Sequence, residues 1–155
     1  MTGQDAAGKL RQQLHFFNNV ADAFAPGHGD YRPTPEMMTV SQQINHVAHT
    51  TRWFRTAIDG EFDMDFERFQ REYMQVSSLA EARDNLTGAY EDFAALVSAQ
   101  SEAWLLQPLP ENRILGPAPR LATIAANADH TAHHRGALSV YLRLLGIAPK
   151  LVYAP

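Results

Sequence analysis

Three histidines lie close together in a long amphipathic segment, "DHTAHHRGALSVYLRLLG", at residues 129–146. His130 and His134 are four positions apart, which places their side chains on one face of a helix with Cβ atoms roughly 5–6 Å apart. Two imidazoles in this arrangement can converge on one metal ion, with Zn–N bonds of ~2.0–2.1 Å. Neutral imidazole is a good ligand for zinc, nickel, copper or iron. The spacing therefore predicts half of a metal site.

A useful site needs a further ligand, and the segment "SQQINHVAHT" at residues 41–50 offers two candidates. His46 stands next to the inward apolar stripe of this segment, and His49 is the competing candidate three residues further on. Sites in helical bundles are assembled from inward-leaning side chains on facing helices. We therefore predict a metal site of His46, His130 and His134.

Each histidine also has a simpler interpretation. His130 and His134 could form a hydrogen-bonded pair or lie half-exposed, and His46 could be a satisfied histidine at the edge of the core. His49 and His133 are interpreted as residues of the surface or of the surroundings of the site. The side chain of His133 points about 100° away from that of His134 around the helix, so it is not expected to reach the same ion.

Four segments carry the apolar repeat of an amphipathic helix, with steps of three and four residues. They cover residues 10–24, 40–58, 79–96 and 124–146. Thr39 with Gln42 has the spacing of a capping box at the start of the second segment. Ser78 with Glu81 has the same spacing at the start of the third. The sequence predicts an all-α antiparallel four-helix bundle that forms a single domain over residues 1–155.

The connection at residues 59–77 is longer than the other connections and contains aromatic residues at near-helical spacing. These residues are Phe62, Phe66, Phe69 and Tyr73. We expect a short extra helix here, laid against the bundle. Its aromatic side chains, together with Trp53 and Tyr141, are candidates for the wall of a substrate pocket, and ordinary packing is the simpler interpretation.

Composition excludes several classes of protein. Hydrophobic residues make up 45% and charged residues 19% of the chain, with a net charge of -4, which is an ordinary globular mixture. No run of Lys and Arg is present, so neither nucleic acid nor an anionic membrane is an expected partner. The chain has no cysteine, no segment like a signal peptide and no stretch of about 18 apolar residues. We expect a soluble, cytoplasmic protein.

The segment "HTAHHRGALSVYLRLLG", which is followed by "IAPK", and the segment "SQQINHVAHTTRWF" resemble the DinB/YfiT-like superfamily of small bacterial four-helix proteins. The resemblance extends over nearly the whole chain. Members typically bind one divalent metal, often nickel or zinc, through one histidine of the second helix and two of the fourth. The resemblance therefore implies the same three ligands, His46, His130 and His134. It also implies association as a homodimer.

The chain departs from the superfamily pattern at two positions. Thr131 follows the first histidine of the last helix, where relatives often have an acidic residue, and Ala137 stands where relatives often have glutamine. A relative's substrate is therefore not transferred to this chain. The residues expected around the metal or along the substrate wall are His49, Trp53, Thr131, His133 and Tyr141. Arg135 is expected to pair with a carboxylate of a neighbouring helix, because an unpaired buried charge is costly.

Three histidine ligands leave coordination positions open for water or substrate, as in catalytic metal sites. The motif "HTAHH" lacks the glutamate of HExxH peptidases, so peptidase activity is not expected. Some branches of the superfamily are transferases or isomerases that use a low-molecular-weight thiol, which the metal activates as a nucleophile. Because this chain has no cysteine, such a thiol would have to come from a cosubstrate. We expect a metal-dependent enzyme that acts on a small molecule by thiol transfer or by hydrolysis. The alternative is a non-catalytic metal-binding sensor or a stress-related binding module.

Overall fold

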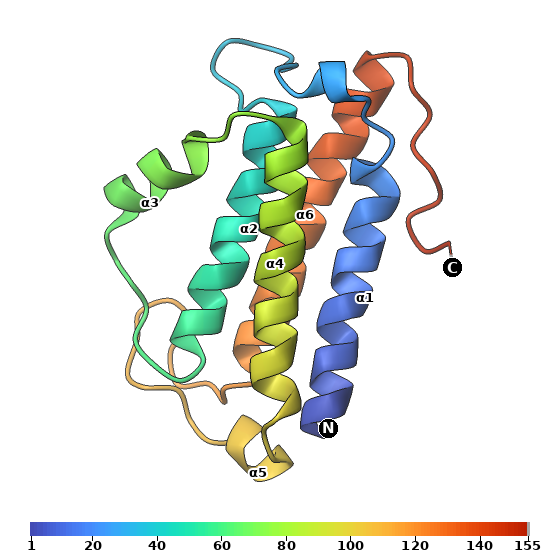
Figure 1. Ribbon diagram of the computed structural model, residues 1–155. Coiled ribbons are helices and arrows are strands. Elements are labelled where there is room, and N and C mark those ends of the chain that lie inside the picture. Colours follow the sequence, from blue (N-terminus) through green and yellow to red (C-terminus); the bar gives the residue numbers. More distant parts are fainter. Residues whose placement is uncertain (155) are drawn as a thin grey trace.

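The computed structural model describes residues 1–154, which contain six α-helices and one 3-10 helix. Four long helices form a bundle: α1 (Gly3–Ala21), α2 (Val40–Ala57), α4 (Leu79–Ser98) and α6 (Ala122–Leu144) (Figure 1). They correspond to the four amphipathic segments of the sequence, and the described part of the chain contains no strand. The prediction of an all-α four-helix bundle is confirmed.

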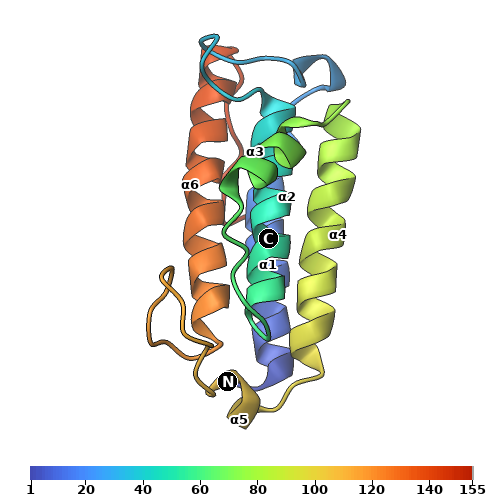
Figure 2. The same ribbon diagram turned by 90° about the vertical axis from the view of Figure 1, so that its left-hand side faces the viewer.

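The four helices are not all antiparallel to their neighbours. Gln43, early in α2, bonds to Tyr141, late in α6, so these two helices run in opposite directions. α1 and α4 are also antiparallel, whereas α2 and α4 run in the same direction (Figure 1, Figure 2). The expected antiparallel packing thus holds for α1/α4 and α2/α6, whereas α1 and α6, which also pack together, run in the same direction (Figure 1). The α2/α4 pair differs because residues 58–78 carry the chain back to the end of the bundle at which α2 begins.

One predicted capping box is present and the other is altered. Thr39 Oγ1 accepts from the Gln42 amide at 3.2 Å, and Gln42 Oε1 accepts from the Thr39 amide at 2.9 Å. At α4, Ser78 accepts from the Glu81 amide at 3.1 Å, but the Glu81 carboxylate accepts from the Ser77 amide at 2.7 Å instead of from Ser78. Both helices therefore begin where the sequence predicts, with their first amide groups satisfied.

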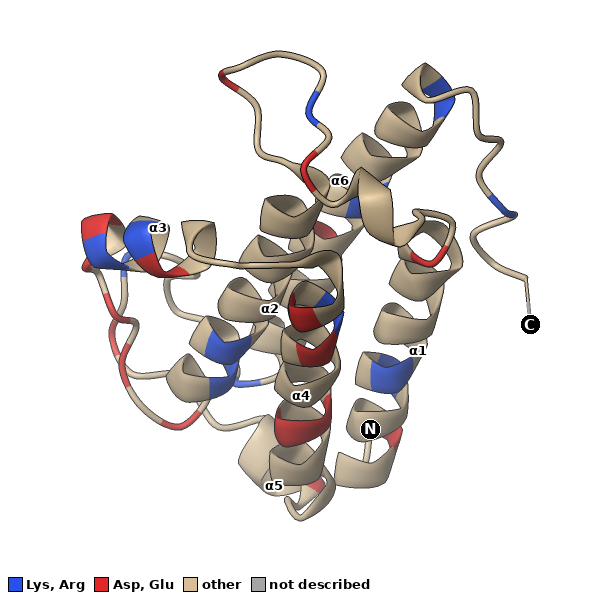
Figure 3. Cartoon of the chain, turned by 45° about the horizontal axis from the view of Figure 1, so that its top comes forward, with Lys and Arg blue, Asp and Glu red and all other residues tan. Residues whose placement is uncertain are grey.

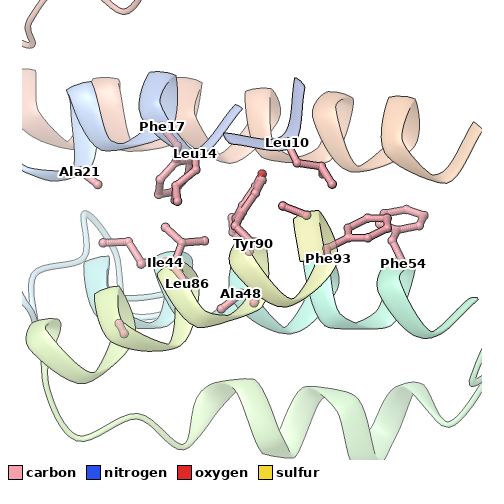
Figure 4. Close-up of a cluster of buried hydrophobic side chains, with 14 of the residues drawn as sticks. Leu10, Leu14, Phe17, Ala21, Ile44, Ala48, Phe54, Leu86, Tyr90 and Phe93 are labelled. Atoms are coloured by element: carbon pink, nitrogen blue, oxygen red, sulfur yellow. The ribbon is translucent and has the colours of Figure 1, made fainter. Parts of the chain in front are cut away.

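The apolar stripes of α1, α2 and α4 meet in a continuous core, to which α6 adds its own apolar residues. Figure 4 shows part of this core, with side chains from α1, α2 and α4 interdigitating. The largest fully buried aromatic residues are Phe17, Phe24, Tyr90, Phe93 and Tyr141. Burial of this apolar surface is the main driving force that holds the four helices together.

The predicted extra helix is present as α3 (Phe66–Met74), which lies across α2 on the outside of the bundle (Figure 2). None of its residues is buried, so it is attached through one face only. Two further short elements were not expected from the sequence: η1 (Pro26–His28) and α5 (Glu102–Leu105). Both occupy connections that are rich in Pro, Gly or Ser.

Charged residues of both signs lie over the outside of the molecule, with acidic residues along α4 and both signs on α3 (Figure 3). Among the described residues, no helix has the length and apolar character needed to cross a membrane.

Two glycines of α1 provide a matched test of the packing. A Cβ at Gly3 would overlap the carbonyl oxygens of Val97 and Gln100 at the end of α4, whereas a Cβ at Gly8 would meet nothing within 4 Å. Gly3→Ala is expected to lower the free energy of unfolding by about 1–3 kcal/mol, because backbone must move. Gly8→Ala is expected to raise it by up to about 1 kcal/mol through helix propensity. Urea unfolding measures both, and effects of the same sign would contradict the close approach of α1 and α4.

Candidate metal centre

Three histidines from two helices converge near the middle of the bundle. His46 comes from α2, and His130 and His134 come from α6. One ring nitrogen of each lies within 4.8 Å of the corresponding nitrogen of the other two. The ring centroids are 4.9 Å apart for His46 and His130, 4.7 Å for His46 and His134, and 4.5 Å for His130 and His134. The structure brings together the three residues that the sequence predicts as ligands.

Buried hydrogen bonds on both sides of this cluster hold α2 against α6. Towards one end, Thr51 donates to Asn127 Oδ1 at 3.0 Å. Towards the other end, Gln43 Nε2 donates to the hydroxyl of Tyr141 at 3.4 Å. Because unpaired buried polar groups are costly, these bonds favour one axial alignment of the two helices. In that alignment His46 lies opposite the turn that carries the other two histidines.

Gln43 also orients one histidine directly. Its side-chain oxygen lies 2.5 Å from His134 Nδ1. An amide oxygen only accepts, so Nδ1 carries the proton and Nε2 is left unprotonated. Tyr141 fixes the Gln43 amide, because its hydroxyl accepts from Gln43 Nε2 and donates to the Met38 carbonyl at 3.0 Å. The chain Met38–Tyr141–Gln43–His134 therefore sets the tautomer of one of the three rings.

The donor set fits a divalent transition metal. The Nε2 atoms of His46 and His130 are 3.1 Å apart, close to the separation of about 3.3 Å that two ligands 2.0–2.1 Å from a tetrahedral zinc ion would have. Burial, followed by the neighbouring imidazoles, lowers the pKa of His46 to about 4 and the pKa values of His130 and His134 to about 3. All three rings are therefore neutral near pH 7, which is the form that binds metals.

A pocket of about 390 Å³ opens beside the cluster. The His46 ring lies 4.3 Å from the ring of Tyr73 and 6.1 Å from that of Phe69, both on α3. His46 and His130 lie at the base of the pocket. Its other lining residues are Thr50, Trp53, Phe66, Phe69, Gln70 and Tyr73. The extra helix α3 thus covers His46 and forms one wall of the pocket beside the histidine cluster.

The other predicted site residues lie around the cluster and not within it. His49 is half-buried, contacts Phe69 with a centroid distance of 6.1 Å, and burial lowers its pKa. His133 is exposed, although its ring lies edge-on to His134 at 4.9 Å. Trp53 lines the pocket and donates its indole N–H to the Asp63 carbonyl at 2.7 Å.

Two residues of α6 face away from the histidines. Thr131 is buried on the core side, where its hydroxyl lies 2.7 Å from the hydroxyl of Tyr90. The expectation for Arg135 is wrong: its guanidinium lies over the Tyr153 ring at 5.6 Å, and no carboxylate of the described residues forms an ion pair with it. Arg135 is only half-buried, so water solvates the charge that was expected to need a partner.

Gln43 and Asn45 are the residues around the site that sequence reasoning missed. Asn45 Nδ2 donates to the Tyr73 carbonyl at 2.8 Å and so ties the end of α3 to α2. Gln43 precedes His46 by three positions, which places both on one helix face. That spacing was a signal for Gln43. Asn45 had no such signal, because its partner lies in a connection whose path the sequence does not reveal.

Acidification is expected to destabilise the metal-free protein. The three histidines of the cluster, of which His134 is buried and the other two are half-buried, have pKa values of about 3–4 in the folded chain, below the usual value of 6.5. Between about pH 6.5 and pH 4 the unfolded chain takes up protons that the folded chain does not, so stability falls by up to about 1.4 kcal/mol per pH unit for each histidine. Urea unfolding of chelator-treated protein across this range measures the slope. A double variant, His46→Gln with His130→Gln, should show a shallower slope, and an unchanged slope would contradict the assignment.

Comparisons with known proteins agree with this architecture. A sequence model of the DinB family matches residues 9–155. The fold is similar to the crystal structure of a DinB-like protein, YjoA, from Bacillus subtilis, with a TM-score of 0.68 and 17% sequence identity, covering 95% of this chain and 96% of that chain. At this identity the likeness shows the fold alone, and no curated protein sequence matches the chain. Since the family match spans nearly the whole sequence, the chain belongs to the DinB family.

Proposed function

We propose that this DinB protein holds one divalent transition metal, nickel or zinc, on His46, His130 and His134, and acts on a small molecule there. The observation that carries the proposal is the convergence of three neutral imidazoles within 4.8 Å, two of which, His46 and His130, line a pocket. The cluster contains no carboxylate, so its donors suit zinc, nickel, copper or iron better than magnesium or calcium.

A divalent ion on three histidines supplies Lewis-acid chemistry at its remaining coordination positions. The residues of the chain prepare the site for it. Gln43 holds the proton of His134 on Nδ1, away from the cluster. Phe69 and Tyr73 cover His46 from α3 and exclude water from one side of the site. A drier site strengthens the interaction between an ion and a polar or anionic reactant.

Thiol transfer is the reaction class that fits these residues best. No Asp or Glu lines the pocket beside the cluster, so the chain offers no carboxylate base there to activate water. In a transfer, the sulfur of a low-molecular-weight thiol forms a bond to an electrophilic carbon, its proton passes to solvent, and the leaving group departs with its bonding electrons. Because the chain has no cysteine, the thiol must be a cosubstrate. Hydrolysis of a small molecule is the second candidate, and the homodimer and the cytoplasmic location stay predictions.

Metal content tests the ligand assignment. Protein purified without a His-tag or a metal column should carry about one equivalent of divalent metal per chain after reconstitution, by elemental analysis. His46→Ala, His130→Ala and His134→Ala should each lose it, because two remaining imidazoles bind weakly. His133→Ala is the matched control, since it removes an exposed neighbouring imidazole and should leave the content unchanged. Stoichiometric metal in all three ligand variants would refute the site.

Turnover separates an enzyme from a sensor. The metal-loaded protein should catalyse transfer of a low-molecular-weight thiol or hydrolysis of an ester, and a chelator should abolish the activity. Metal binding without any turnover would favour the non-catalytic alternative, and activity that survives chelation would contradict the mechanism.

The hydrogen bond from His134 to Gln43 gives a separate prediction. Gln43→Leu removes the acceptor and releases the ring, so metal affinity should fall about 10- to 100-fold, as measured by competition with a chromogenic chelator. Gln43→Glu keeps an acceptor and should retain most of the affinity. Gln12→Leu, an exposed glutamine on α1, is the control for the loss of an amide. Equal affinity of the wild type and Gln43→Leu would show that Gln43 does not orient the ligand.

A further inference from the structure

The pocket beside the histidines carries no charge on its walls. Its lining consists of aromatic rings, the amide of Gln70, the hydroxyls of Thr50 and Tyr73 and the rings of His46 and His130, and it includes no Asp, Glu, Lys or Arg. The charged residues of α3 lie elsewhere: Arg68 pairs with Glu72 at 3.1 Å and also with Asp63 and Asp65, all of them exposed. An ionised group on the part of a ligand that lies against these walls, away from the histidines, would therefore lose hydration without gaining a partner.

Aromatic rings form most of the wall. The ring centroid of Trp53 lies 6.2 Å from that of Phe66 and 6.4 Å from that of Phe69. The ring centroids of Phe69 and Tyr73 are 5.6 Å apart. Phe66 is 52% exposed although it faces this wall, so part of its ring is not covered by the protein itself. The indole N–H of Trp53 is already bonded to Asp63, which leaves its ring face as an apolar surface. Such a wall favours a flat apolar body.

Besides the two histidines, one pocket residue has a buried polar atom without a partner. Thr50 is 5% exposed, and its hydroxyl makes no hydrogen bond to the described residues. It lines the same pocket and follows His46 by four positions, so both side chains lie on one face of α2, a single turn apart. Buried hydroxyls are nearly always paired, and a group supplied by a ligand would satisfy this one.

We infer that the pocket binds a small molecule with an uncharged aromatic or similarly flat apolar body, and that Thr50 is a positioning residue for it. The apolar body lies against Trp53, Phe66 and Phe69, and the polar, reacting end points to the histidines. There the Thr50 hydroxyl bonds to a polar atom of that end. This inference names the substrate class of the site under the proposed function and rests on that proposal.

Three hydroxamates test the substrate class on metal-loaded protein. Acetohydroxamate carries only a metal-binding group, benzohydroxamate adds a neutral ring, and 4-carboxybenzohydroxamate adds a charge to the ring. Binding is followed by the fluorescence of Trp53 in a Trp104→Phe background, since Trp104 stacks on Arg120 away from the pocket. Benzohydroxamate should bind about 10- to 100-fold more tightly than acetohydroxamate, because its ring is buried. The carboxylate should remove most of this gain.

Two substitutions separate the roles of the wall and the hydroxyl. Phe69→Ala should weaken the binding of benzohydroxamate several-fold more than that of acetohydroxamate, because only benzohydroxamate has a ring that lies against Phe69. Thr50→Val should weaken both probes by about 3- to 10-fold, as expected for the loss of one hydrogen bond, and Thr50→Ser should restore the affinity. Thr87→Val, an exposed threonine of α4, is the control and should have no effect.

The outcomes distinguish this inference from the proposed function. If none of the three hydroxamates binds to protein that carries one equivalent of metal, the site has no coordination position open to a ligand and the proposed function fails. If acetohydroxamate binds as tightly as benzohydroxamate, or the charged probe binds as tightly as the neutral one, the metal site stands and the substrate class is wrong. If Thr50→Val binds both probes as the wild type does, the positioning role of Thr50 is wrong.

Discussion

The axial alignment of α2 against α6 is the constraint on which the candidate site depends. A helix advances 1.5 Å and turns about 100° per residue, so a shift of one residue between the two helices would turn His46 away from its partners. Apolar packing alone tolerates such shifts better than buried hydrogen bonds do. The bonds from Thr51 to Asn127 and from Gln43 to Tyr141 lie on either side of the histidines and oppose a slide in either direction. Polar groups in this core thus position the site.

The histidines impose a local cost on the fold that a bound ion would offset. His46 and His130 each have a buried Nδ1 without a hydrogen-bond partner, and burial keeps all three rings neutral. The rings of His46 and His130 bond only to each other, through their Nε2 atoms at 3.1 Å, and the ring of His134 bonds to Gln43. Three clustered imidazoles with two buried nitrogens left unpaired would be unfavourable in a purely structural role. The arrangement is easier to understand as a site in which the lone pairs of the imidazole nitrogens bind a metal ion.

The topology of the bundle and the pocket have the same origin. α2 and α4 can run in the same direction only because a long connection returns the chain along the outside of α2. That connection contains α3, whose aromatic residues line the pocket beside the histidines. Asn45 fastens it by bonding to the Tyr73 carbonyl, and Asn85 of α4 bonds to Asn45 in turn at 3.0 Å. The segment that makes the parallel pair possible therefore also supplies the wall beside the candidate metal ligands.

The sequence by itself determined the features that depend on neighbours within one helix. The four apolar repeats, the start of α2 at Thr39 and the pairing of His130 with His134 all follow from spacing along one rod. The tertiary structure alone decided what depends on how rods are placed beside each other. It set α2 parallel to α4, turned Thr131 towards Tyr90, and left Arg135 in partial contact with water. The apolar repeat in the sequence indicates which face of a helix points inward. It does not indicate which residue of another helix that face contacts, because the contact depends on how the helices are placed in the bundle.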